Sequence, residues 1–215
     1  MALSKFNFNS LNVTPTASKV LKFNSSNDGL EAGDVGGALV LISEQTASSS
    51  STINFTSGID STYKEYIFKF INIHPATDNS KLQFQADTGT NTNYNQTIHT
   101  TFFHAANNEG GTDSGPVEYE TAHDKALGTL YQDLNRNVGN DSDQVCCGFL
   151  RLFEPSSSVF VKHFFSTIST QAQNEYNDVT YIAGYFNVTT PITRVSFKMN
   201  TGNIDSGTIK MYGVT

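Results

Sequence analysis

Apolar and polar residues alternate with a period of two along much of the chain after residue 38. In residues 82–86, Leu82, Phe84 and Ala86 alternate with two glutamines, and residues 192–199 repeat the pattern. Successive side chains of a β-strand point to opposite faces, so one apolar face indicates a half-buried strand. We therefore expect the chain to consist mainly of β-strands.

The longest run rich in apolar and aromatic residues, residues 65–73, predicts the central strand of the domain. Its composition is typical of a strand that is buried on both faces. Pro75 and the polar residues after it end this strand and predict a turn. Because residues 82–86 follow the turn directly, we expect the two strands to pair as a β-hairpin at the centre of the domain.

Other strands follow at regular intervals, separated by short polar runs that predict turns. They are predicted at residues 38–42, 52–56, 94–105, 145–153, 159–168, 178–188, 192–199 and 208–214. About ten short strands joined by turns are typical of an all-β sandwich or barrel. We expect a jelly-roll-like β-sandwich that occupies residues 36–215.

One segment of the chain changes period and predicts a short helix. Leu127, Leu130, Tyr131, Leu134 and Val138 have the spacing i, i+3, i+4, i+7 and i+11. This spacing places apolar side chains on one face of an α-helix. Gly139 is a typical stop signal. We expect one helix at about residues 123–137, outside the two sheets.

Residues 1–35 are predicted to form an extended N-terminal arm. The segment has too few apolar residues to close a core of its own. Large apolar residues nevertheless recur along it: Phe6, Phe8, Leu11, Val13, Val20, Leu21 and Phe23. Such residues need an outside surface to bury them, either a neighbouring subunit or a larger assembly. The alternative is a frayed terminus that has no role.

Charge and targeting signals narrow the possible partners. The net charge of −7 and the pI near 5.1 argue against nucleic-acid binding through a basic face and against binding to anionic membranes. We expect synthesis in a cytoplasm, because the first residues lack a secretion signal.

Cys146 and Cys147 are adjacent, so an ordinary disulfide between them is strained. We expect them to be small apolar side chains in a reduced compartment.

The sequence gives only weak indications of a metal site. His99 and His104 would face opposite sides of one strand, so they cannot share a metal ion. Residues 133–144 resemble the start of a calcium loop. In a calcium loop the glycine occupies the sixth position, whereas Gly139 occupies the seventh position here. Gln144, at the twelfth position, offers no bidentate carboxylate. We expect no metal and no cofactor, although the calcium alternative for residues 133–144 stays open.

Candidate catalytic residues are equally sparse. Glu118, Glu120 and Asp124 could supply the paired carboxylates of a glycoside hydrolase. The sequence does not fix their separation, and acidic residues in loops are usually solvated. No serine-hydrolase elbow, phosphate-binding loop or dinucleotide fingerprint occurs. We therefore expect a protein that is not an enzyme and has no catalytic residues.

Several stretches resemble a family of virion structural proteins from tailed marine phages, including cyanophages. The matching segments are residues 2–16, 58–63, 68–77, 90–97, 153–157, 161–164, 181–185 and 202–213. The resemblance covers nearly the whole chain. It implies a virion component that is made in the host cytoplasm and bound to other capsid or tail proteins. It carries over no catalytic residues.

The resulting hypothesis is a non-enzymatic virion structural protein that decorates the capsid or forms part of a tail fibre. The first alternative is a receptor-binding module that recognises host surface glycan. An enzyme acting on such glycan is a further alternative. We expect a homo-oligomer, since identical chains usually assemble with closed symmetry. A trimer is preferred only because fibre and decoration proteins of the kind it resembles are often trimers.

Overall fold

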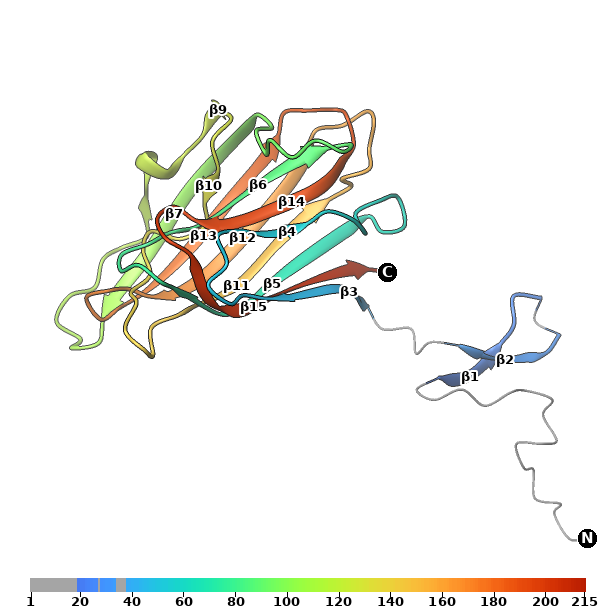
Figure 1. Ribbon diagram of the computed structural model, residues 1–215, viewed down its shortest axis with the longest axis horizontal. Coiled ribbons are helices and arrows are strands. Elements are labelled where there is room, and N and C mark those ends of the chain that lie inside the picture. The colour runs from blue at the N-terminus through green and yellow to red at the C-terminus, as the bar shows by residue number, and fades with distance from the viewer. Residues whose placement is uncertain (1–18, 27, 34–37) are drawn as a thin grey trace, which may run out of the picture. The chain divides into compact units, whose positions relative to one another are not determined.

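The computed structural model describes residues 19–26, 28–33 and 38–215. By internal contacts the chain divides into two compact units, Met1–Ala38 and Leu39–Thr215. In the first unit, β1 (Val20–Phe23) and β2 (Leu30–Gly33) form an antiparallel pair (Figure 1). The described part of the second unit contains two antiparallel sheets.

The larger sheet has nine strands within the described residues, and eight of them form a continuous ladder. In spatial order these are β3 (Leu39–Thr46), β15 (Ile204–Val214), β5 (Glu65–Pro75), β11 (Cys146–Phe153), β12 (Lys162–Gln171), β13 (Tyr176–Phe186), β7 (Ile98–Asn108) and β8 (Glu118–Tyr119). The ninth strand, β9 (Ala126–Gly128), also pairs with β7.

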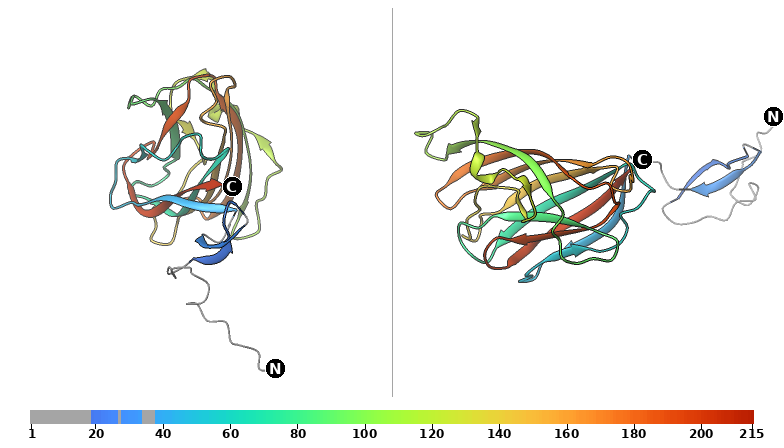
Figure 2. Two further views of the ribbon diagram at one scale, coloured as in Figure 1. Left: turned by 90° about the vertical axis from the view of Figure 1, so that its right-hand side faces the viewer. Right: turned by 90° about the horizontal axis from the view of Figure 1, so that it is seen from above.

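The smaller sheet has four strands in the described chain and lies across one face of the larger sheet (Figures 1 and 2). Its order is β10 (Gln132–Asp133), β6 (Leu82–Thr88), β14 (Ile192–Met199) and β4 (Ile53–Phe55). The predicted all-β sandwich is therefore confirmed. No helix in the described residues is long and apolar enough to cross a membrane.

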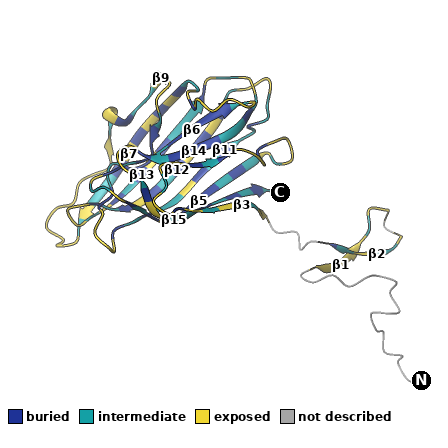
Figure 3. Ribbon diagram, viewed as in Figure 1, coloured by how far each residue is buried: buried dark blue, intermediate teal, exposed yellow. Residues whose placement is uncertain are grey.

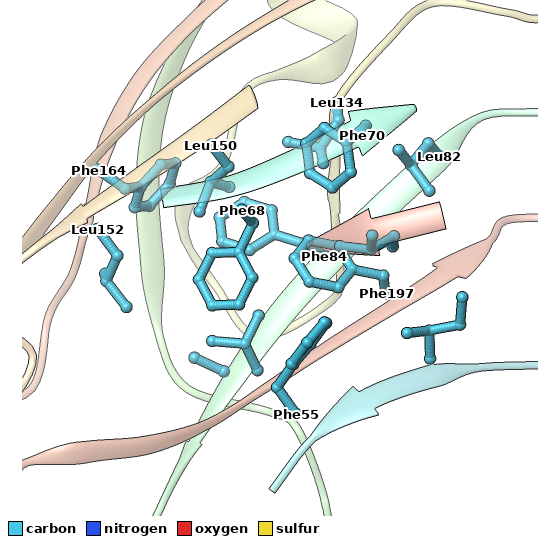
Figure 4. Close-up of a cluster of buried hydrophobic side chains, with 14 of the residues drawn as sticks. Phe55, Phe68, Phe70, Leu82, Phe84, Leu134, Leu150, Leu152, Phe164 and Phe197 are labelled. Carbon is cyan, nitrogen blue, oxygen red and sulfur yellow. The ribbon is translucent and has the colours of Figure 1, made fainter. Parts of the chain in front are cut away.

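The hydrophobic core lies between the two sheets and is rich in phenylalanine (Figure 4). Phe84 of the smaller sheet packs edge-on against Phe164 of the larger sheet, with ring centroids 4.8 Å apart. Phe55 meets Phe68 in the same way at 5.3 Å. Edge-to-face pairs of this kind add about 0.5–1.5 kcal/mol to the stabilisation from burial. Aromatic contacts between the layers therefore help to hold the sheets together.

Strand alternation decides which residues reach this core. In β7, Ile98, Thr100 and Phe102 are buried, while His99 and the other intervening residues are exposed (Figure 3). This alternation is that of the half-buried strands predicted for the chain after residue 38. The opposite face of the larger sheet, called the outer face below, is not covered by a second layer in the described chain.

The predicted central hairpin is wrong. Strand β5 pairs with β11 and β15 in the larger sheet, whereas β6 pairs with β14 and β10 in the smaller one. The turn at residues 76–81 therefore carries the chain from one layer to the other. Burial of β5 on both faces is also wrong, because Ile71 is 40% exposed on the outer face. The prediction failed because β5 also carries apolar residues on its outer side, where they are partly exposed.

The predicted helix at residues 123–137 is also wrong. This segment contains the end of the short 3-10 turn η2 (Thr121–His123), followed by β9 and β10. Leu130 is 75% exposed, while Leu134 and Val138 are buried in the core. Val138 exchanges two backbone hydrogen bonds with Ser80, at 2.7 and 3.1 Å. Pairing with the smaller sheet overrides a weak helical preference, which Gly128 lowers by about 1 kcal/mol relative to alanine.

The two cysteines of β11 are free thiols on opposite faces of the larger sheet. Cys146 lies in the core, where burial raises the pKa of its thiol. Cys147 is half-buried on the outer face, and its Sγ accepts a hydrogen bond from the Asn72 backbone N–H at 3.2 Å. Only Cys146 therefore behaves as the expected small apolar core side chain.

Candidate functional site

The described part of the N-terminal arm exposes its apolar side chains. Val20, Leu21 and Phe23 of β1 are all exposed, and Phe23 reaches 70%. Lys22 and Glu31 form an ion pair across the hairpin at 3.3 Å. A two-stranded hairpin alone is marginally stable in water. This hairpin therefore offers an apolar surface without a core of its own.

Phe6, Phe8, Leu11 and Val13 lie outside the described residues. The predicted attachment set thus reduces, in the structure, to the three exposed residues of β1.

The outer face of the larger sheet carries exposed aromatic residues on adjacent strands. Phe149, Thr167, Tyr181 and Phe103 form one row across β11, β12, β13 and β7. Tyr181 and Phe103 stack with their ring centroids 5.4 Å apart. Thr167 separates this aromatic pair from Phe149. Exposed apolar surface marks interaction sites in soluble proteins where it is contiguous, as at Tyr181 and Phe103.

The sequence did carry a signal for this aromatic face. The adjacent pairs at residues 102–103 and 164–165 are both Phe-Phe. Because neighbouring residues of a strand face opposite sides, such a pair must place one ring outside the core unless both faces are covered. The structure bears this out for the second pair, since Phe164 is buried and Phe165 is 52% exposed.

A shallow depression lies on this outer face, with a volume of about 250 Å³. Its small central residue is Ala183, flanked by Phe165 of β12 and Thr101 of β7 in the same row. The next row is His163, Tyr185 and His99. The Tyr185 ring lies 5.6 Å from the ring of His163 and 5.5 Å from the ring of His99.

A cluster of ionisable side chains surrounds His104 of β7 and Asp178 of β13, which are buried on the inner face of the larger sheet. The buried His104 Nδ1 lies 3.4 Å from Asp178 Oδ1, and Arg136 Nη1 lies 3.5 Å from Asp178 Oδ2. His104 Nε2 lies 3.7 Å from Glu118 Oε2 and 3.9 Å from Glu120 Oε2. Burial raises the pKa of the Asp178 carboxyl, although His104 and Arg136 oppose this shift.

This cluster shows where the predicted hydrolase carboxylates lie. Glu118 and Glu120 both approach the same nitrogen of His104, so the imidazole lies beside both carboxylates. Asp124 does not join them, and it accepts a hydrogen bond from the Tyr119 hydroxyl instead. The carboxylates of Glu118, Glu120 and Asp178 therefore lie around one guanidinium and one imidazole.

The oxygens of the calcium candidate have other partners. Asp133 Oδ2 lies 2.7 Å from His123 Nδ1, and Asn135 Oδ1 accepts the Leu82 N–H at 2.7 Å. Burial alone would raise the pKa of Asp133, but hydrogen bonds from His123 and Gln83 outweigh it and hold the pKa below its usual value. The described residues contain no group of three or more His, Cys, Asp or Glu arranged to hold a metal ion.

Comparison with known proteins adds little. No family model and no curated protein matches the chain. A solved structure titled "Crystal Structure of A. japonicus CB05" is similar at a TM-score of 0.28 and 13% identity. The match covers 91% of this chain but only 31% of that chain. A similarity this low carries no argument about fold or function.

Proposed function

We propose that this protein is a non-enzymatic structural component of a tailed-phage particle, either a capsid decoration or part of a tail fibre. The proposal rests on the sequence resemblance over nearly the whole chain. The observation that supports it best is the hairpin of β1 and β2, whose Val20, Leu21 and Phe23 are exposed. A sandwich with its own core, preceded by an arm that lacks one, suits a protein held to a larger assembly by that arm.

The arm would attach the protein by burying this apolar surface against a neighbouring chain. Full burial of a large apolar side chain contributes about 1.5–3 kcal/mol. Three such side chains, each already partly buried, could supply several kcal/mol toward attachment. The partners would be capsid or tail proteins and other copies of the same chain. We propose a homo-oligomer, with a trimer as the symmetry to test first.

The ionisable cluster around His104 gives no reason to propose catalysis. Its carboxylates are engaged with His104 and Arg136. The side chains of Glu118 and Glu120 are 57% and 29% exposed, so both carboxylates reach solvent and make only long ionic contacts with His104. We therefore propose a structural role for Glu118 and Glu120.

Deletion of residues 1–35 tests the attachment. The truncated protein should keep its melting temperature, because the core lies within residues 39–215, and it should no longer bind to particles that lack the protein. Unfolding of the truncated protein would show that the arm belongs to the core. Full occupancy on particles would show that the anchor lies elsewhere.

A milder variant separates loss of the arm from loss of its apolar residues. The triple substitution Val20→Ser, Leu21→Ser and Phe23→Ser keeps the chain length and should reduce particle binding at least tenfold. Its matched control replaces three exposed apolar residues of the sandwich with serine: Leu130, Val159 and Phe160. The control should bind as the parent does, and equal losses would contradict specific attachment through the arm.

A further inference from the structure

We infer that the depression around Ala183 on the outer face is a binding site for one neutral pyranose ring of a glycan. The inference rests on the geometry of this face alone. It does not depend on attachment through the arm.

The depression combines an apolar floor with unpaired polar groups at its edge. Ala183 and Phe165 supply the apolar surface, and Tyr185 supplies an aromatic ring at one end. None of the described residues forms a hydrogen bond with the imidazoles of His99 and His163 or with the Tyr185 hydroxyl. A pyranose has the complementary chemistry, since its C–H face packs on apolar and aromatic surface while its hydroxyls point outward to donors and acceptors.

The charge of the depression favours a neutral ligand. No carboxylate, lysine or arginine lines it. Anionic groups such as phosphate are usually bound by arginine or lysine, and cationic ligands by carboxylates or by faces of several aromatic rings. The volume of about 250 Å³ lies below the range of roughly 300–1,000 Å³ that holds drug-sized molecules. The site therefore suits a single ring of a larger polymer.

Peptide binding by strand addition is excluded at this position. Strand β12 is paired with β11 and β13, and β13 is paired with β12 and β7. At the depression β7 is paired with β13 and, near His99, with β9. Strand addition needs an open sheet edge with free backbone groups. Recognition here must use side chains alone.

Saturation-transfer NMR on the full chain tests the site. The probes are the methyl glycosides of glucose, galactose, mannose and N-acetylglucosamine. At least one should receive saturation on its ring protons, with a Kd on the order of 1–10 mM, as expected for a small ligand on an open surface. Failure of all four to bind at 20 mM would overturn the inference.

Substitutions then locate the binding. Ala183→Tyr fills the depression and should raise the Kd at least tenfold, as should Tyr185→Ala. Tyr185→Phe keeps the ring and should lose less than Tyr185→Ala. The control is Ala105→Tyr, because Ala105 is also half-buried and faces outward on β7, opposite Val179. Equal sugar binding by Ala183→Tyr and the parent would overturn the site.

Two further measurements separate this inference from the proposed function. Ala183→Tyr should still attach to particles at full occupancy, because attachment is assigned to the arm. Sedimentation of the same variant should match that of the parent. A changed oligomeric state with unchanged sugar binding would identify the face as a subunit interface and overturn the glycan site.

Discussion

Replacing Phe164 or Phe165 with alanine gives a direct test of which face of the larger sheet is buried. The two residues are adjacent and identical in type. Phe164 is fully buried, with ring centroids 4.8 Å from Phe84 and 5.4 Å from Phe186. Phe165 is 52% exposed and has one aromatic neighbour, Phe153, at 5.8 Å.

The expected costs differ several-fold. Phe164→Ala should lower the free energy of unfolding by about 3–5 kcal/mol, because it removes buried apolar surface and leaves a cavity between the sheets. Full burial of a phenylalanine contributes about 1.5–3 kcal/mol, so a half-exposed ring should contribute roughly 1 kcal/mol. Phe165→Ala should therefore cost about 1 kcal/mol.

Urea unfolding followed by circular dichroism measures both values. With a denaturant dependence of about 2–3 kcal/mol/M, Phe164→Ala should lower the midpoint by about 1–2 M and Phe165→Ala by less than 0.5 M. Equal losses for the two variants would refute the assignment of faces. A loss for Phe165→Ala that depends on protein concentration would instead show that the outer face is buried between subunits.

Two further predictions concern buried charged groups. Burial raises the pKa of Asp178, so the stability that this group contributes is present below the ordinary aspartate pKa of about 3.9 and is lost as pH rises through the raised value. Between pH 4 and 7 the parent should therefore lose unfolding free energy relative to Asp178→Asn. A relative gain by the parent over this range would show that His104 and Arg136 lower this pKa. Lys162 is buried and its Nζ donates to three backbone carbonyls, at 2.7, 3.0 and 3.0 Å. Lys162→Met should cost about 2–3 kcal/mol in urea unfolding because those carbonyls lose a charged donor, and an unchanged midpoint would mean that water replaces the ammonium.

Local patterns were enough to predict strands but not the layer to which each strand belongs. The alternation in residues 192–199 predicts β14 with its correct bounds. The turn after Pro75 was also correctly expected, yet β5 and β6 lie in different sheets. A turn that closes a hairpin and a turn that crosses between layers have similar compositions, so partner choice depends on contacts distant in sequence.

The false helix has a related cause. Leu134 and Val138 are spaced as on a helix, but they reach the core from the bent segment that follows β10 and hydrogen-bonds beside β6. The candidate sites were even harder to predict, because they are formed by residues that are distant in sequence. The row of His163, Tyr185 and His99 joins three strands whose register no local pattern specifies.

The position of β15 between β3 and β5 has a consequence for synthesis on the ribosome. Thr46 of β3 lies beside Thr208 of β15, which is 162 residues later in the chain. Within the described chain, β3 has no other strand partner. A nascent chain therefore carries β3 with its backbone hydrogen-bonding groups unpaired until β15 has left the exit tunnel. Unpaired apolar strands readily associate with other chains. We expect pauses in translation between these two strands to increase aggregation of newly made protein.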